Sequence, residues 1–245
     1  MTRYRYSRMP EGPAPMGLVV LQTDETIESD MRRMLPHDVP LYVTRVASAQ
    51  DVTPDSLRAM TGHITNAAKL LPQALPFSSI GYGCTSATAQ IGADEVARLI
   101  TAGAQTARVS DPLTALIAAC RALGVTRLGF LSPYTADVSD KLRAALADAG
   151  IETPVFGSFE EANEASVVRI AAQSIIDAAC DLVTQDSVEA VFLSCTNLRT
   201  LDVISQIEER TGIACLSSNQ VLGWHLASAA NVPGKLNAAT RAQAK

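Results

Sequence analysis

The second half of the chain repeats the first, and this repeat restricts the possible folds more than any other feature. The segment MGLVVLQTDETIESDMRRML resembles RLGFLSPYTADVSDKLRAAL in its pattern of apolar and polar residues. Gly17 and Gly129 occupy matching positions 112 residues apart. Cys84 and Cys195, each at the end of an apolar run and each followed by threonine, are 111 residues apart. Two anchors with nearly equal spacing predict two similar lobes related by a pseudo-twofold axis.

Each half alternates short apolar runs with segments of helical periodicity. The run at 16–22 is continuously apolar up to its last residue, as expected for a strand buried on both faces. Within 111–124, apolar residues recur with helical spacing and end at a glycine, which predicts a helix with a glycine cap. Single helices are also expected over 56–73, 85–103, 164–184 and 198–212. This alternation predicts an α/β protein with mostly parallel sheets flanked by helices.

The repeat also suggests how the chain is divided. We expect residues 1–15 to form a flexible tail, residues 16–125 and 216–245 a first lobe, and residues 126–215 a second lobe. In open α/β sheets, ligands bind outside the carboxyl ends of the strands. Two such sheets facing one another would place Cys84 and Cys195 on opposite walls of one cleft, which is the predicted active site.

Composition excludes several classes of protein and site. A net charge of −5 without a basic run argues against a nucleic-acid partner, and no apolar stretch reaches the roughly 20 residues that span a bilayer. The N-terminus has no apolar core of signal-peptide length, and five cysteines without a CxxC pair do not form a disulfide framework, so we expect a cytoplasmic protein. No histidine has zinc-type spacing to a cysteine, and the common nucleotide-binding motifs are missing, so neither a metal nor a nucleotide cofactor is expected.

The two cysteines lie where a strand is expected to lead into a helix. A thiolate is the reactive form of cysteine, and a helix N-terminus stabilises it. Free amides at such a junction can also hold a substrate carboxylate. The residues that follow, Thr85 and Ser86 in one half and Thr196 and Asn197 in the other, add short-range donors suited to carboxylate oxygens.

Two thiols on opposite faces of a small acid permit chemistry without a cofactor. One thiol can remove a proton while the other donates one to the opposite face, which is racemisation. Alternatively, one thiolate adds to an activated double bond and the other handles a proton, so that the resulting single bond can rotate. Cys120, Cys180 and Cys215 lie on apolar stripes or in an apolar run and are expected to pack in the core. Tyr134, in the repeat position of Gln22, either donates to the substrate or packs at the edge of the site.

At this point the segments GYGCTSATAQIG, FLSCTNLRT, FLSPYTADV and SSNQVLGWHL can be taken together. They resemble the maleate isomerase and arylmalonate decarboxylase branch of the aspartate/glutamate racemase superfamily, from Met16 to about Val232. The paired cysteines are shared across the superfamily, whereas the SSNQ-x-x-x-W pattern and the Pro-Tyr pair are more specific to this branch. The resemblance implies two pseudosymmetric α/β lobes, no cofactor, a small dicarboxylate-like substrate and a homodimer or higher homo-oligomer.

The resemblance also implies roles for individual residues. Cys84 would attack the alkene, Cys195 would handle the proton, and Tyr134 would contact the substrate. The carboxylates would be held by the residues after the two cysteines, namely Thr85, Ser86, Thr196 and Asn197. Because arylmalonate decarboxylases keep only the second cysteine, the presence of both argues against decarboxylation.

One loop departs from the pattern of maleate isomerases. They carry an asparagine in a Ser-Ser-Asn-Thr loop after the first strand, whereas this chain has Gln22-Thr23-Asp24-Glu25. We expect Gln22 and Asp24 of this loop to contact the substrate. Asp24 would repel a substrate carboxylate unless it is protonated or paired, and it could instead contact an amino group or assist a base, as the first-lobe aspartate does in amino-acid racemases. Glutamate racemases have a histidine after the second Cys-Thr, where this chain has Asn197. The loop and the DPLTAL segment are more similar to ectoine-utilisation proteins of this branch.

Three functions therefore stay open at this point. The first is a cofactor-independent isomerase of a small carboxylic acid, of the maleate isomerase type. The second is a racemase or epimerase of an amino acid or related small acid, in ectoine breakdown for example. The third is a non-catalytic protein that binds a small acid.

Overall fold

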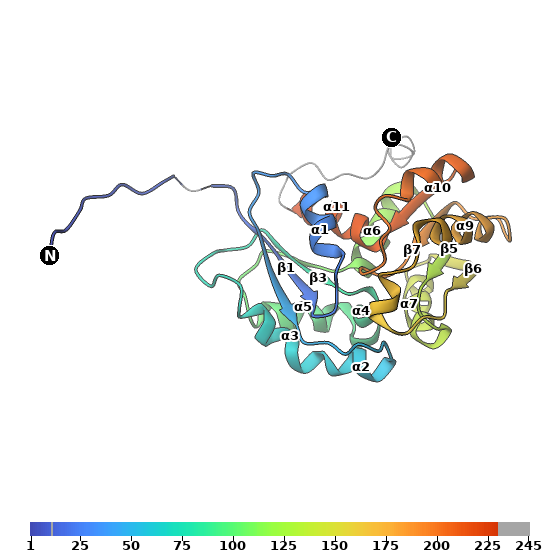
Figure 1. Cartoon of the computed structure of the whole chain (residues 1–245), viewed down its shortest axis with the longest axis horizontal. Coiled ribbons are helices and arrows are strands. Elements are labelled where there is room, and N and C mark those ends of the chain that lie inside the picture. Colours follow the sequence, from blue (N-terminus) through green and yellow to red (C-terminus); the bar gives the residue numbers. More distant parts are fainter. Residues whose placement is uncertain (11, 230–245) are drawn as a thin grey trace.

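The computed structural model describes residues 1–10 and 12–229, and within them the strands form two four-stranded sheets. The strand orders are β2-β1-β3-β4 and β6-β5-β7-β8, and every pairing is parallel. The second order is the first with four added to each strand number, so the two sheets have the same topology. The predicted α/β fold with two pseudosymmetric lobes is confirmed, and Figure 1 shows the two sheets side by side.

The strands form where the sequence has its apolar runs. Their bounds are β1 Met16–Leu21, β2 Leu41–Val46, β3 Ser79–Gly83, β4 Val109–Ser110, β5 Arg127–Ser132, β6 Glu152–Ser158, β7 Ala190–Leu193 and β8 Ala214–Ser217. Every residue of β1, β3, β7 and β8 is buried, whereas the edge strands β2 and β6 are partly exposed. Central strands of parallel sheets are covered on both faces, which explains why β1 and β7 are continuously apolar. β8 is also buried, although it lies at the edge of its sheet.

The helices cover both faces of each sheet. Their bounds are α1 Ile27–Met34, α2 Pro54–Ala59, α3 Thr61–Ala68, α4 Thr85–Ile91, α5 Ala93–Thr101, α6 Pro112–Leu123, α7 Ala136–Asp148, α8 Glu164–Val167, α9 Ala172–Leu182, α10 Ile204–Thr211 and α11 Ser218–Ala229. In the first sheet, Val19 and Leu21 of β1 share a core with α3 and α5, and Leu18 and Val20 share another with α1 and α11. Alternate residues of one strand therefore support two separate helical layers.

Each half of the chain contributes one helix that packs on the sheet of the other half. α6 follows the last strand of the first sheet, yet Leu116 and Cys120 of α6 pack with Phe130 and Phe192 of the second sheet. α11 follows the last strand of the second sheet, yet Leu222 and Leu226 of α11 pack against β1 of the first. The predicted lobe boundaries stay a prediction, and residues 230–245 of the expected first lobe lie outside the described part of the chain.

Three of the expected single helices are interrupted, and a fourth begins late. The 56–73 segment divides into α2 and α3, the 85–103 segment divides at Gly92, and the 164–184 segment divides between α8 and α9. Gly92 has a φ of 99°, which a right-handed helix cannot contain. The expected 198–212 helix begins only at Ile204. The apolar periodicity continues across these breaks because both pieces face the same core, so the pattern alone does not reveal them.

Residues 1–10 are exposed and contain no helix or strand, and the chain extends away from the lobes there (Figure 1). The flexibility expected of this tail stays a prediction. No helix among the residues that the structure describes is long and apolar enough to cross a membrane.

Candidate active site

Cys84 lies at the junction of β3 and α4, as the sequence predicts. It is the N-cap residue of α4, with an extended backbone at φ −153°, and its sulfur accepts a hydrogen bond from the Ala87 amide at 3.4 Å. An N-cap side chain that accepts an amide from the third helical residue satisfies a donor that otherwise has no partner within the helix. The first turn of α4 therefore directs a backbone donor at the thiol.

Cys195 has a different setting, and the helix expected directly after it is absent. The helix α10 begins at Ile204, and Cys195 itself has a φ of 93°, which is rare outside glycine. Its sulfur accepts a hydrogen bond from the Asn197 amide at 3.3 Å and lies 2.9 Å from the Tyr134 hydroxyl oxygen. The strained backbone turns the thiol toward Tyr134 and frees the following residues to contact the other lobe.

The loops that carry the two thiols lie side by side between the sheets. The Thr196 hydroxyl donates to the Gly83 carbonyl at 3.1 Å, which joins the residue after Cys195 to the residue before Cys84. Both cysteines are buried, and the same two carboxyl groups, Asp24 and Glu164, act electrostatically on both thiols. The repeat thus places the two cysteine loops next to each other, whereas the predicted cleft between the two thiols stays a prediction. The buried group that they form is called the thiol site below, and it consists of Asp24, Cys84, Tyr134, Glu164, Cys195 and Asn197.

Asn197 holds the thiol site together through both ends of its side chain. Its Oδ1 accepts from the Glu25 amide at 2.9 Å, and its Nδ2 donates to Glu164 Oε2 at 2.6 Å. Its backbone carbonyl accepts from the Thr26 hydroxyl at 2.9 Å. The loop after β7 is thus tied to the loop after β1, and Asn197, expected to hold a substrate carboxylate, holds a protein carboxylate in this structure.

Asp24 is buried with only one of its carboxyl oxygens hydrogen-bonded. Its Oδ1 accepts from the amides of Thr26 and Ile27, both at 2.8 Å. Its Oδ2 is buried and lacks a hydrogen bond while the Thr196 hydroxyl donates to Gly83, although this hydroxyl lies close enough to Asp24 to stabilise its carboxylate form. Burial raises the pKa of this carboxyl, although the two amides act in the opposite direction. A buried acceptor without a partner is costly, so Oδ2 is the part of the site most in need of a donor.

Glu164, a residue that the sequence analysis does not single out, completes the thiol site. It is 3% exposed, and its Oε1 accepts from the Tyr134 hydroxyl at 2.5 Å. Burial raises the pKa of Glu164, and the hydrogen bonds from Tyr134 and Asn197 lower it. Its position soon after β6, at the same carboxyl edge as the other site loops, is a signal for a site residue. The helical periodicity of 164–184 instead predicts one long helix there.

Both thiols are neutral near pH 7 in this buried site. Burial raises the pKa of Cys84 to about 12, against the effect of the Ala87 amide, and the charges of Glu164 and Asp24 raise it further. Burial also raises the pKa of Cys195 well above its usual value, with Glu164 the next contribution in the same direction. The helix N-terminus alone therefore does not produce a thiolate at Cys84, contrary to the simplest expectation from the sequence.

The other predicted substrate-binding residues divide into two groups. Thr85 donates to Ser218 at 2.8 Å and Ser86 is buried with its amide directed at Cys84, so both line the thiol site's edge. Gln22 is exposed and lies outside the buried cluster. Asn219, from the SSNQ motif, supports the site from below: its Nδ2 donates to the Thr196 carbonyl at 2.8 Å.

The remaining cysteines are packing residues, as predicted. Cys120 and Cys215 are fully buried in apolar cores, and Cys180 is partly buried against one of them. Among the described residues, no group of three or more His, Cys, Asp or Glu side chains is arranged to hold a metal ion.

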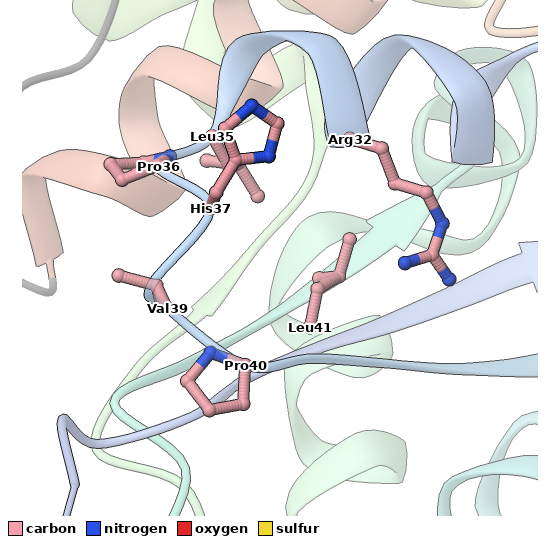
Figure 2. A pocket seen from close by; sticks show the side chains of 7 residues that line it. All are labelled: Arg32, Leu35, Pro36, His37, Val39, Pro40 and Leu41. Carbon is pink, nitrogen blue, oxygen red and sulfur yellow. The ribbon is translucent and has the colours of Figure 1, made fainter.

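A separate hollow lies at the opposite edge of the first sheet. It has a volume of about 440 Å³ and is lined by Arg32, Leu35, Pro36, His37, Val39, Pro40 and Leu41. Figure 2 shows these side chains around the turn that joins α1 to β2. Leu41 pairs with Met16 at the amino ends of β2 and β1, whereas Cys84 follows the carboxyl end of β3. This hollow is therefore distinct from the thiol site.

Comparisons with known proteins identify relatives of this chain. The model of a family described as arylmalonate decarboxylase matches residues 16–243. The maleate isomerase of Nocardia farcinica (strain IFM 10152) is 24% identical over 229 residues, 89% of this chain and 90% of that protein. The arylmalonate decarboxylase of Bordetella bronchiseptica is 26% identical over 215 residues, 85% of this chain and 87% of that protein.

A solved structure shows the same fold. It is the Nocardia farcinica maleate cis-trans isomerase, a cysteine-to-serine mutant with a covalently bound succinylcysteine intermediate. The TM-score is 0.78 at 23% identity, and the match covers 90% of this chain and 94% of that chain. The resemblance drawn from the four sequence segments is thereby confirmed. The chain belongs to the arylmalonate decarboxylase family.

Proposed function

We propose that this protein is a cofactor-independent isomerase of a small carboxylic acid, of the maleate cis-trans isomerase type, acting through Cys84 and Cys195. The observation that carries the proposal is the thiol site itself. Equivalent loops of the two lobes bring two cysteines into one buried cluster, and their surroundings suit two different tasks.

Cys84 is suited to act as the nucleophile. The Ala87 amide is directed at its sulfur. This donor stabilises the negative charge of the thiolate, both before the sulfur adds to the substrate and when elimination releases it again. No proton-accepting side chain is hydrogen-bonded to its sulfur among the described residues. A sulfur that forms and breaks a bond to carbon benefits from a fixed donor more than from a proton acceptor.

Cys195 is suited to handle the proton. Its sulfur lies 2.9 Å from the Tyr134 hydroxyl oxygen, within the range expected for proton transfer between heavy atoms. In the proposed reaction, Cys84 reacts as a thiolate after losing its S–H proton to water, and its sulfur bonds to one alkene carbon. The neighbouring carbon takes the proton of Cys195, which is left as a thiolate. The former double bond is then single and rotates. Removal of the proton by Cys195 and release of Cys84 give the other isomer.

The relatives support this class of reaction. The curated relatives are a maleate isomerase and an arylmalonate decarboxylase, and the solved isomerase carries a succinyl group on a cysteine. Such an adduct is the species expected after addition of a thiol to maleate and protonation of the neighbouring carbon. Action in the cytoplasm, as a homodimer or higher homo-oligomer, and in ectoine breakdown stay predictions from the sequence.

Asp24 and Glu164 favour a second candidate, the racemisation or epimerisation of an amino acid. The two carboxyl groups are buried beside the thiols, and Asp24 Oδ2 has no hydrogen bond. A substrate ammonium group would supply the missing donor and offset the negative charge, whereas a dicarboxylate would be repelled by any ionised carboxyl. The two thiols would then exchange the α-proton between the two faces.

Turnover of maleate, followed by nuclear magnetic resonance, tests the first candidate. Wild-type protein is expected to form fumarate, and Cys84→Ala and Cys195→Ala are each expected to abolish this conversion. Cys180→Ala, which removes a partly buried cysteine on α9 that is not one of the thiol-site residues, is the control and is expected to keep turnover. Conversion by either thiol-site variant at the wild-type rate would refute the two-thiol mechanism.

Deuterated water separates the two candidates. A racemase must exchange the α-proton of an amino acid with solvent, so deuterium should enter a recovered amino acid only if the second candidate is correct. Maleate turnover without exchange of any amino acid's α-proton would favour the isomerase.

A further inference from the structure

A chain of two hydrogen bonds links the Cys195 thiol to a buried carboxyl. The Tyr134 hydroxyl donates to Glu164 Oε1 at 2.5 Å, and the Tyr134 oxygen lies 2.9 Å from the Cys195 sulfur. All three side chains are buried, at 4%, 3% and 3% exposure for Tyr134, Glu164 and Cys195. Tyr134 follows β5, Glu164 is the first residue of α8 after β6, and Cys195 follows β7, so the fold brings the three groups to the same edge of the second sheet.

Asn197 sets the direction of these hydrogen bonds. Its Nδ2 can only donate, and it donates to Glu164 Oε2 at 2.6 Å. With that oxygen occupied, Oε1 accepts the single hydroxyl hydrogen of Tyr134. The Tyr134 oxygen is then an acceptor toward Cys195, so the thiol hydrogen points along the chain toward the carboxylate.

We propose that Glu164 is the proton acceptor of Cys195, reached through the Tyr134 hydroxyl. The Cys195 S–H bond breaks as a new O–H bond forms on Tyr134, and the original Tyr134 O–H bond breaks as one forms on Glu164. A neutral thiol and a carboxylate become a thiolate and a neutral carboxylic acid. The role of this step in turnover rests on the proposed function, in which Cys195 gives a proton to the substrate carbon and takes it back. The transfer to Glu164 determines what fraction of Cys195 carries that proton.

The transfer addresses the main electrostatic problem of the site. Ionisation of a buried thiol by loss of its proton to water would add a negative charge beside those of Glu164 and Asp24. Transfer to Glu164 moves one existing charge from oxygen to sulfur and leaves the total charge unchanged. The other titratable groups that face Cys195 and Glu164 are Asp24, Cys84 and Tyr134 itself, and none of them is a cation.

The pH dependence of Cys195 alkylation by iodoacetamide tests the transfer without a substrate. The thiolate is the reactive form, so the rate follows its population. In the wild-type protein, the alkylation rate of Cys195 is expected to become independent of pH once Glu164 is ionised. Above that pH, Cys195 and Glu164 share one proton, so the fraction of Cys195 that is thiolate no longer changes with pH. In Glu164→Gln the thiol can lose its proton only to water, and the rate is expected to rise about tenfold per pH unit.

Peptide mass spectrometry measures each cysteine in the same sample, and Cys180 is the internal reference, since its alkylation should have the same pH dependence in both proteins. Tyr134→Phe keeps the Glu164 carboxyl and removes the connecting hydroxyl. The pH-independent rate of Cys195 alkylation is therefore expected to fall by about tenfold or more. Thermal unfolding confirms that each variant is folded.

The same dependence of Cys195 alkylation on pH in wild type and in Glu164→Gln would overturn the proposal. An unchanged pH-independent alkylation rate in Tyr134→Phe would overturn the route through the hydroxyl. Neither result depends on turnover. A failure of the wild-type protein to isomerise maleate would count against the proposed function, whereas the labelling profiles would still decide the role of Glu164.

Discussion

Asp24 is the residue whose surroundings say most about the substrate. It lies in the loop after β1, its Oδ1 is held by two amides, and its Oδ2 is buried without a partner. The sequence identifies this position as unusual, because maleate isomerases carry asparagine there. The structure adds that the carboxyl belongs to the same buried cluster as Glu164 and both thiols. The charge on Asp24 therefore affects substrate binding and thiol ionisation together.

Asp24→Asn distinguishes a dicarboxylate substrate from an amino acid. The asparagine keeps the oxygen that accepts from Thr26 and Ile27, and its Nδ2 replaces the unpartnered oxygen with a donor. For a dicarboxylate, KM is expected to fall by about tenfold, since a repulsive charge is replaced by a hydrogen-bond donor. For an amino acid bound through its ammonium group, KM should rise instead. Steady-state kinetics with maleate measures the change, and a higher KM for maleate would contradict the first account.

The site residues were predictable to different degrees. The repeat and the Cys-Thr pairs identify Cys84 and Cys195, because matching positions in two similar lobes must lie at equivalent sheet edges. Glu164 was not predictable in this way, since it has no counterpart in the repeat and its segment has helical periodicity. The positive φ of Cys195 also leaves no trace in the sequence, because such a conformation normally marks glycine or asparagine.

At the scale of elements, α1 and α11 are joined beneath the thiol site by a buried polar contact. Asn219 Nδ2 donates to Asp30 Oδ2 at 2.9 Å and to the Thr196 carbonyl at 2.8 Å. Arg33 lies 3.9 Å from the other oxygen of Asp30. The apolar stripe of α1 predicts that it packs on a sheet, but a buried aspartate within that stripe has no explanation from periodicity. The explanation lies in α11, which is distant in sequence.

The Asp30 carboxyl is expected to make stability depend on pH. Burial raises its pKa from 3.8 to about 6, although Asn219 opposes the change. The folded protein therefore binds more protons than the unfolded chain between these values, and the free energy of unfolding falls as pH rises from about 4 to about 6. The loss is on the order of 3 kcal/mol and changes little above that range.

Asp30→Asn should remove this dependence. Denaturant unfolding at pH 4 and pH 7 measures the free energy of unfolding of wild type and variant. The variant is expected to become more stable relative to wild type as pH rises. Glu28→Gln, which changes a half-buried carboxyl on the same helix, is the matched control and should retain the wild-type dependence. Equal pH dependence in wild type and Asp30→Asn would contradict this assignment.

At the scale of the whole molecule, the exchange of α6 and α11 makes each lobe depend on the other. The sequence predicts both helices and their apolar stripes, but a stripe does not indicate which sheet covers it. In the structure each helix packs on the sheet of the opposite half. Further contacts between the halves lie at the thiol site, where Thr196 bonds to Gly83 and Thr85 to Ser218. Neither lobe therefore has a complete core or a complete site by itself.

The two lobes are accordingly expected to unfold in one transition. The single tryptophan, Trp224, lies on α11 and reports on the exchanged helix, whereas far-ultraviolet circular dichroism reports on the helices of both lobes. The two signals should have the same denaturant midpoint, as for a cooperative two-state transition. Separate midpoints would show that the lobes are independent.

The most direct test of the central claim, that Cys84 adds to the substrate while Cys195 handles the proton, is a mass measurement on Cys195→Ser incubated with maleate. Serine at this position keeps a hydroxyl that can relay a proton from water to the adduct. The neutral hydroxyl is a poor base and should remove the proton again only slowly. The account predicts an increase equal to the mass of one maleic acid molecule, located by peptide mapping on Cys84. An unmodified Cys84, with or without an adduct at another residue, would contradict it.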